Sequence, residues 1–133
     1  MSSSKLSQSS ALRSIGILFG AVPFGYGINA ILRPDDALTL FKLEPPALPA
    51  DKALVNSLMA IYGIRNLFMG AAIFAAGYHR AHKTLGWILI ALGGVALGDG
   101  LVCYQAGKGG EWGHWGYAPI SAIVGSLFLG LLG

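Results

Sequence analysis

Two opposite charges lie inside apolar runs of this chain, and they are the residues best placed to do chemistry. Asp99 stands in the run VALGDGLVCY, residues 95–104, and Arg65 stands in the apolar stretch of residues 53–78. A charge in the middle of a membrane-spanning helix costs roughly 2.5 to 3.5 kcal/mol on insertion scales, so such residues usually face the bundle interior and have a partner. The pair is a candidate for acid–base chemistry or for holding helices in register.

The two charges are expected at the same depth. Arg65 lies 13 residues before Tyr78, and Asp99 lies 14 residues after Leu85. These residues end and begin two antiparallel helices joined by a short loop, so each charge is about 20 Å from that loop. We therefore predict that the two side chains meet. Buried ion pairs are weak evidence for net stability, so a structural role and a role in a site both stay open.

Polar and aromatic side chains surround the predicted pair. Tyr62, Asn66 and Tyr104 lie on the same two helices as the charges. The glycine-rich segment that follows contributes a carboxylate, an imidazole and two indoles: Glu111, His114, Trp112 and Trp115. Titratable, hydrogen-bonding and aromatic groups around one space are typical of a ligand site, and a glycine-rich segment can adapt as a lid. Alternatively, the tryptophans belong to the membrane interface, and Glu111 and His114 are solvated.

The composition is that of a membrane protein. Of the 133 residues, 54% are hydrophobic and only 11% are charged, which is unlike a soluble domain. The basic residues are scattered, which argues against nucleic-acid binding. Twenty glycines favour close helix packing in lipid, and glycine-rich faces also allow a homo-oligomer. The single Cys103 excludes paired-cysteine chemistry, and no zinc-ligand spacing is present, so we expect no metal and no cofactor.

The apolar runs predict an all-α fold, a polytopic membrane protein built as a four-transmembrane-helix bundle. Residues 1–10 are expected to be a disordered tail, and residues 11–133 a single transmembrane domain. The first run is too long for a signal-peptide core and should stay in the mature protein. The four spans are expected at residues 12–32, 53–78, 85–104 and 117–132.

Between the first two spans the pattern changes. Residues 35–43 predict a short amphipathic segment on the membrane interface, ended by prolines 45, 46 and 49, with Asp51 as the N-cap of the second span. Two pairs of glycines spaced four apart predict close helix contacts: Gly16 with Gly20, and Gly94 with Gly98.

Three motifs together resemble a known family: YGIRNLFMG around Arg65, LGDGLV around Asp99, and GHWGYAP before the last run. The family comprises small four-span membrane proteins described only as a domain of unknown function, distantly similar to DoxX-type proteins and often found in fungal secondary-metabolite gene clusters. The resemblance covers nearly the whole chain after residue 10. It implies a tailoring reaction on a lipophilic intermediate, such as a cyclisation, with Arg65, Asn66, Asp99 and His114 as the matched polar positions.

The first functional hypothesis is a membrane-embedded cyclase or isomerase acting on a lipophilic polyene or terpenoid natural-product intermediate that enters from the membrane lipids. Asp99 would act as the acid, and Arg65 would hold its carboxyl group or bind an oxygen of the substrate, while Tyr62 and Tyr104 stabilise developing positive charge. A guanidinium favours the ionised form of a neighbouring carboxyl group, which suits a base better than an acid. If the pair is tight, Glu111 or His114 becomes the better acid.

Other functions fit the same residues. A non-catalytic lipophile-binding or scaffold subunit would use the charged pair only to fix helix register. A small channel or proton-coupled transporter would need several copies of the chain. In each case we expect a multi-pass integral membrane protein, located in the endoplasmic reticulum if the source is eukaryotic.

Overall fold

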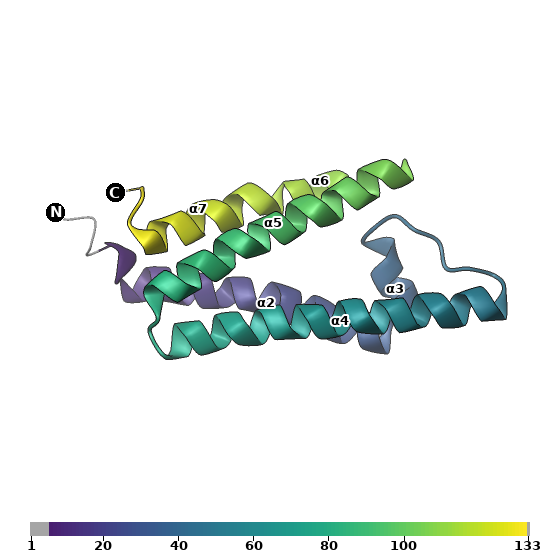
Figure 1. The fold of residues 1–133 in the computed structure, drawn as a ribbon, viewed down its shortest axis with the longest axis horizontal. Helices are drawn as coiled ribbons and strands as arrows, with labels where there is room; N and C mark the ends of the chain where they lie inside the picture. Colours follow the sequence, from purple (N-terminus) through teal and green to yellow (C-terminus); the bar gives the residue numbers. More distant parts are fainter. Residues whose placement is uncertain (1–5, 133) are drawn as a thin grey trace.

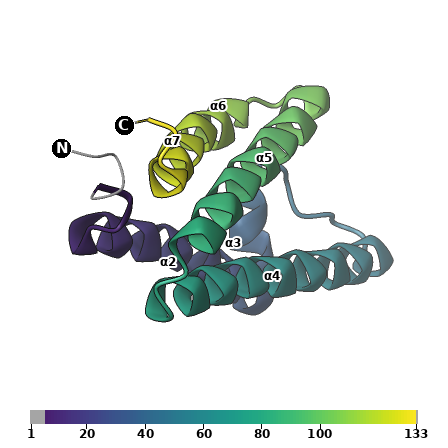
Figure 2. The same cartoon turned by 60° about the vertical axis from the view of Figure 1, so that its left-hand side comes forward.

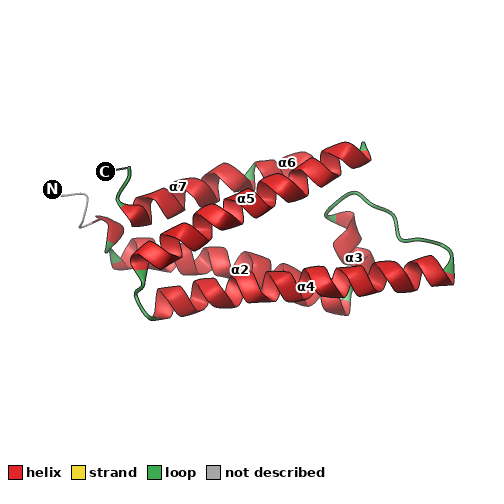
Figure 3. Ribbon diagram, in the orientation of Figure 1, coloured by secondary structure: helices red, strands yellow, loops and turns green. Residues whose placement is uncertain are grey.

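The computed structural model describes residues 6–132, and these residues form helices joined by short connections (Figures 1 and 3). Within that range the structure has no strand, which confirms the all-α prediction. The helices in chain order are α2 (Ser10–Leu32), α3 (Pro34–Thr39), α4 (Pro49–Tyr78), α5 (His82–Ala106), α6 (Glu111–Trp115) and α7 (Tyr117–Leu129).

The helices form two pairs. Helix α2 packs along α4, and α5 packs along α6 and α7, whereas contacts between the pairs are fewer (Figure 1). The pairs are closest near the turn that joins α4 to α5, where α2 also begins and α7 ends, and they diverge toward α3 (Figures 1 and 2). The order around the bundle is therefore α2, α4, α5 and α7.

Glycines bring the two backbones of the α2–α4 pair into direct contact. A Cβ atom built at Gly63 would lie 2.7 Å from the carbonyl oxygen of Gly27, and one built at Gly70 would lie 2.7 Å from that of Gly20. These glycines repeat every seven residues, so each pair of positions returns to the same helix face. Gly16, the other half of the predicted ridge, packs instead against the ring of Phe128 in α7.

The α5–α7 pair is built in the same way. We refer to the row of contacting glycines in each helix pair as its seam. A Cβ atom at Gly86 would lie 2.8 Å from the carbonyl oxygen of Gly125, and Gly93 faces the backbone of α7 at the next level. The predicted close contact at Gly94 and Gly98 is not made within the described chain, since no atom of another helix lies within 4 Å of a Cβ built at either glycine. Gly94 follows Gly93 by one residue and Gly98 precedes Gly100 by two, so both point away from α7.

Two apolar clusters are stacked along the bundle. The cluster near the α4–α5 turn contains Leu12, Ile73, Leu85, Leu89 and Phe128. The second lies at the wide end and contains Ala30, Leu38, Phe41, Met59 and Cys103. The predicted amphipathic segment is present as α3 and the turn after it, and its apolar side chains are buried against α2 and α4.

Among residues 6–132, three helices, α2, α4 and α5, are long and apolar enough to cross a membrane. The first three predicted spans are confirmed in this sense, whereas residues 117–132 do not form a helix of that length. Helix α7 has 13 residues, which extend about 20 Å and fall short of a hydrocarbon core of roughly 30 Å. Helix α6 ends at Trp115 and α7 begins at Tyr117, so Gly116 separates two short helices.

Helix starts differ slightly from the predictions. Residues 1–5 of the predicted tail lie outside the described residues, and Ser9 caps α2 by accepting a hydrogen bond from the Leu12 amide. Helix α4 begins four residues before the predicted span, because Pro49 occupies its first position, where proline is favoured. Asp51 therefore lies in the first turn of α4 and is not its N-cap.

Candidate functional site

The predicted contact between Arg65 and Asp99 is present. The Nη2 atom of Arg65 lies 3.0 Å from one carboxylate oxygen of Asp99 and 3.3 Å from the other. The guanidinium also lies over the ring of Tyr62, 4.8 Å from its centroid. The Arg65 side chain is 42% exposed and that of Asp99 is 19% exposed. The ion pair thus bridges α4 and α5 at the edge of the bundle.

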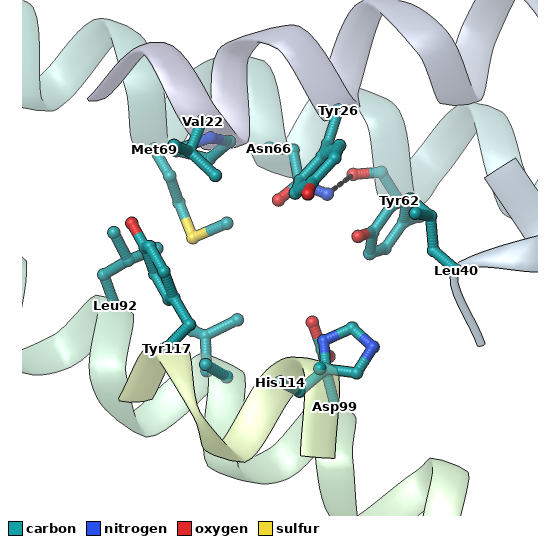
Figure 4. A pocket seen from close by; sticks show the side chains of 14 residues that line it. Val22, Tyr26, Leu40, Tyr62, Asn66, Met69, Leu92, Asp99, His114 and Tyr117 are labelled. Atoms are coloured by element: carbon teal, nitrogen blue, oxygen red, sulfur yellow. Dashed lines mark hydrogen bonds between the residues drawn. The ribbon is translucent and has the colours of Figure 1, made fainter. Parts of the chain in front are cut away.

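A cavity of about 170 Å³ lies inside the bundle, next to this ion pair and between the two apolar clusters (Figure 4). Its polar lining comes from five helices and consists of Tyr26, Tyr62, Asn66, Asp99, His114 and Tyr117. The remaining walls are mainly apolar, from Val22, Pro23, Leu40, Met69, Leu92, Val95 and Ala96.

Helical spacing brings the polar groups into the cavity from two sides. Tyr62, Asn66 and Met69 lie three or four residues apart on α4, so they share one face. The Asn66 side chain is held there because its Nδ2 donates to the Tyr62 carbonyl oxygen at 3.0 Å. Asp99 and His114 reach the same space from the opposite helix pair (Figure 4).

The imidazole of His114 closes the wide end of the cavity. It stacks on the ring of Phe41 with centroids 5.1 Å apart, and Phe41 in turn meets Tyr62 edge-on at 5.3 Å. Phe41 belongs to the turn after α3, so the α3 segment and α6 together position the histidine. A single row of rings therefore connects α6 with α4 across the end of the cavity.

The cavity opens on one side. Among its lining residues, Val22 and Tyr26 of α2 and Gly113 of α6 are exposed, whereas those of α4 and α5 are mostly buried or half-buried. The opening therefore lies between α2 and α6. On the same side, further along, Tyr117 packs on Phe19 with ring centroids 5.5 Å apart.

Five predicted site residues do not line the cavity, and Arg65, which holds Asp99 from outside it, is one of them. Tyr104 and Trp112 are exposed side chains outside it. Trp115 fastens α6 to α5, because its Nε1 donates to the Leu97 carbonyl oxygen at 3.2 Å and its ring covers Gly100. One carboxylate oxygen of Glu111 is buried and has no hydrogen-bond partner among the described residues. Trp115 thus has a packing role.

Tyr26, Met69 and Tyr117 line the cavity and were not predicted as site residues. Met69 shares a helix face with Tyr62 and Asn66, a signal that is visible in the sequence. Tyr26 stands in a run with no charged residue between Arg13 and Arg33, so no local signal marks it. Its place in the wall depends on how α2 lies against α5 and α7.

Metal ligands do not converge in this part of the chain. Among residues 6–132, no three His, Cys, Asp or Glu side chains form a group able to hold an ion. The expectations that no metal and no cofactor are needed remain predictions.

Three long apolar helices, with a partly polar cavity between two helix pairs, define a polytopic helical membrane protein. The model of a family described as a domain of unknown function, DUF4267, matches residues 20–128, and the chain therefore belongs to this family. The matched range includes every residue that lines the cavity. No curated protein and no solved structure matches the chain.

Proposed function

We propose that this protein is a membrane-embedded cyclase or isomerase that acts on a lipophilic substrate by acid–base chemistry. One observation carries the proposal: a carboxylate, Asp99, and an imidazole, His114, line the same largely apolar cavity together with three tyrosine side chains. Cavities with mostly apolar walls and a few convergent polar groups are the usual form of small-molecule sites.

The size of the cavity limits what reacts inside it. An apolar cavity of about 150 Å³ holds one benzene molecule, so 170 Å³ fits a six-membered ring or the folded end of a chain. The rest of a polyene or terpenoid would leave through the opening between α2 and α6. A substrate dissolved in the membrane could reach that opening from the side.

The ion pair decides the roles of the two titratable groups. A carboxylate held by an arginine suits a proton acceptor and a counter-charge better than a proton donor. We therefore propose Asp99 as the base. The role of the acid, which the sequence analysis gave first to Asp99, is proposed for His114. Glu111, the other alternative acid, does not line the cavity.

The proposed reaction returns an isomer of the substrate. His114, in its protonated form, donates a proton to an alkene carbon or an epoxide oxygen, and the resulting cation closes a ring or shifts its double bond. Asp99 then removes a proton from the neighbouring carbon. The tyrosine ring faces stabilise the cation, and the apolar walls exclude water that would capture it. The proton returns from Asp99 to His114 through water at the opening.

We further propose that α6 and α7 together complete a fourth pass. Residues 111–129 would extend about 28 Å as a helix with one bend, close to the thickness of a hydrocarbon core. In line with the resemblance to small four-span proteins, the substrate would be a secondary-metabolite intermediate. The membrane would be the endoplasmic reticulum in a eukaryote.

Deuterium incorporation tests the proposed reaction. Protein in lipid nanodiscs is incubated with a linear polyprenyl chain carrying a terminal epoxide, in H₂O and in D₂O. Epoxide opening places the incoming proton on oxygen, where it exchanges, so a polyprenyl chain without the epoxide is assayed in parallel. That second substrate should give an isomer one mass unit heavier in D₂O.

Two variants complete this test. Asp99→Asn should abolish conversion, while Asp51→Asn, an exposed carboxylate in the first turn of α4, should leave it unchanged. Conversion of neither substrate by a protein that binds both would contradict the enzymatic proposal, as would full activity of folded Asp99→Asn.

The alternative function is binding of a lipophile without conversion. It is favoured by one observation: the Arg65 guanidinium already forms an ion pair with the Asp99 carboxylate, as expected if the two residues only join α4 to α5. On this alternative, wild-type protein binds the polyprenyl chain and Asp99→Asn changes stability alone.

A further inference from the structure

A second cavity lies at the end of the bundle where the turn between α4 and α5 meets the beginning of α2 and the end of α7 (Figure 1). Its volume is about 340 Å³. Its walls include side chains from the segment before α2, from the first turn of α5 and from the last turn of α7, namely Gln8, His82, Lys83, Thr84, Phe128 and Leu129. Lys83 lies about 24 Å along α5 from Asp99, so this cavity is separate from the one that Asp99 lines.

The end of the bundle that holds this second cavity carries cations and no acidic residue. All six acidic residues of the chain lie elsewhere, at positions 35, 36, 44, 51, 99 and 111. Arg13, Arg80 and Lys83 lie at this end, and among residues 6–132 none of the three forms an ion pair. An anion that meets these groups therefore comes from outside that part of the chain.

The wall formed by α5 presents hydrogen-bond donors without acceptors. The backbone amides of Lys83 and Thr84 have no acceptor among residues 6–132, because α5 begins here without a side-chain cap. The His82 ring stacks on Phe128 with centroids 6.0 Å apart, and its Nδ1 atom is buried with no partner in the same part of the chain. Buried polar atoms normally have a partner. Together these donors and the lysine suit an anion with several oxygens, such as a phosphate group.

This end of the bundle is expected at the level of lipid headgroups. Helix α4 ends at Tyr78 and α5 begins at His82, and both helices are long and apolar enough to cross a membrane. Tyr78 is 80% exposed and Trp87 is 63% exposed, and tyrosine and tryptophan gather at membrane interfaces. Anionic lipid headgroups lie at this level and attract basic residues there.

We propose that this second cavity binds the headgroup of an anionic phospholipid. Lys83, His82 and the first amides of α5 bind the phosphate, and the apolar wall of Phe128 and Leu129 packs against the first part of an acyl chain. A zwitterionic headgroup would bring a cation to an end of the bundle that has no carboxylate, so an anionic one fits better. The proposal is independent of the proposed reaction, since it uses none of the residues around Asp99.

Two basic residues three positions apart test the site. Lys83 lines the second cavity, whereas Arg80, also exposed and in the same connection between α4 and α5, does not. Wild-type protein, Lys83→Gln and Arg80→Gln are delipidated in mild detergent, and binding of phosphatidylglycerol is measured by native mass spectrometry. Loss of a charge-assisted hydrogen bond at Lys83 should weaken binding about tenfold, and Arg80→Gln should weaken it about twofold or less.

The comparison also separates other sources of the anion. Equal loss in the two variants overturns the proposal, because a diffuse basic surface would then attract the lipid. Phosphatidylcholine bound as tightly as phosphatidylglycerol overturns it too. Inorganic phosphate that binds as tightly as the lipid would show a site for a free anion and would also overturn it.

Photolabelling checks the position in the wild-type protein. Phosphatidylglycerol with a diazirine near the top of one acyl chain is added to protein in phosphatidylcholine nanodiscs, and it should label Leu129. An excess of unlabelled phosphatidylglycerol should remove this adduct and leave adducts at Trp87, an exposed residue one turn further along α5 that does not line the cavity. Equal competition at both positions, or no adduct at Leu129, would contradict the site.

Discussion

The contacts within each helix pair differ from the contacts between the pairs. Within the α2–α4 pair, backbone meets backbone at Gly27 and Gly63, with no room for a methyl group. Between the pairs, the main polar link at mid-depth is the ion pair of Arg65 with Asp99, and a 170 Å³ cavity remains beside it. At mid-depth, therefore, the contact within a pair is close and apolar, whereas the contact between the pairs is polar and leaves a cavity.

This difference shows how so small a bundle can keep an internal space. A cavity costs stability because its walls lose packing contacts. Here the glycine contacts hold the two helices of each pair together. The two apolar clusters join one pair to the other on either side of the cavity along the bundle. The polar side chains between the pairs can then line the cavity, because glycine contacts already hold each pair together.

The largest expected effect comes from a seam glycine. Gly70→Leu places side-chain atoms against the Gly20 backbone and should cost about 3 kcal/mol or more, enough to lose folded protein. Gly25→Leu, which meets open space, should fold normally. The check is the yield of monodisperse protein after extraction into mild detergent. Equal yields would show that the pairs are not held by these seams.

An intermediate effect is expected at the ion pair. Arg65→Leu leaves the Asp99 carboxylate without its partner, and Asp99→Asn leaves the guanidinium alone, so each should destabilise the fold by about 2 kcal/mol. The double variant should lose less than the two single variants together. Unfolding by denaturing detergent measures all four proteins. Strict additivity would mean that the pair contributes no interaction energy between α4 and α5.

The smallest effect is expected at a hydrogen bond inside the second seam. The buried hydroxyl of Ser121 donates to the Leu89 carbonyl oxygen at 2.7 Å, linking α7 to α5. Ser121→Ala keeps the small size and removes only this bond, so the expected loss is about 0.6 kcal/mol in the same unfolding experiment. A loss as large as that of Gly70→Leu would show that polar contacts, and not close packing, join this pair.

The ion pair could be predicted from the sequence, and much of the cavity wall could not. Arg65 and Asp99 are almost equally far from one short loop, so counting residues along two helices places them together. Tyr26 and Tyr117 belong to helices without that constraint, and their place depends on how the two pairs diverge. His114 was predicted from its type, but its stacking on Phe41 needs the fold of the α3 segment.

Two errors in the predicted fold have clear physical causes. The predicted ridge at Gly94 and Gly98 assumed contacts every four residues, whereas the seam of α5 uses every seventh residue from Gly86. The predicted fourth span, residues 117–132, corresponds to α7, whose 13 residues are too few to cross a hydrocarbon core.

The central claim is that the cavity between the helix pairs receives a lipophilic ligand, and photolabelling tests it most directly. Protein in nanodiscs is irradiated with a polyprenyl chain bearing a terminal diazirine, and adducts are mapped by peptide mass spectrometry. Adducts should fall on Tyr26, Met69 and Tyr117, and Met69→Trp, which fills the cavity, should remove them. Adducts confined to outward side chains such as Ile64 and Phe68, unchanged by Met69→Trp, would contradict the account.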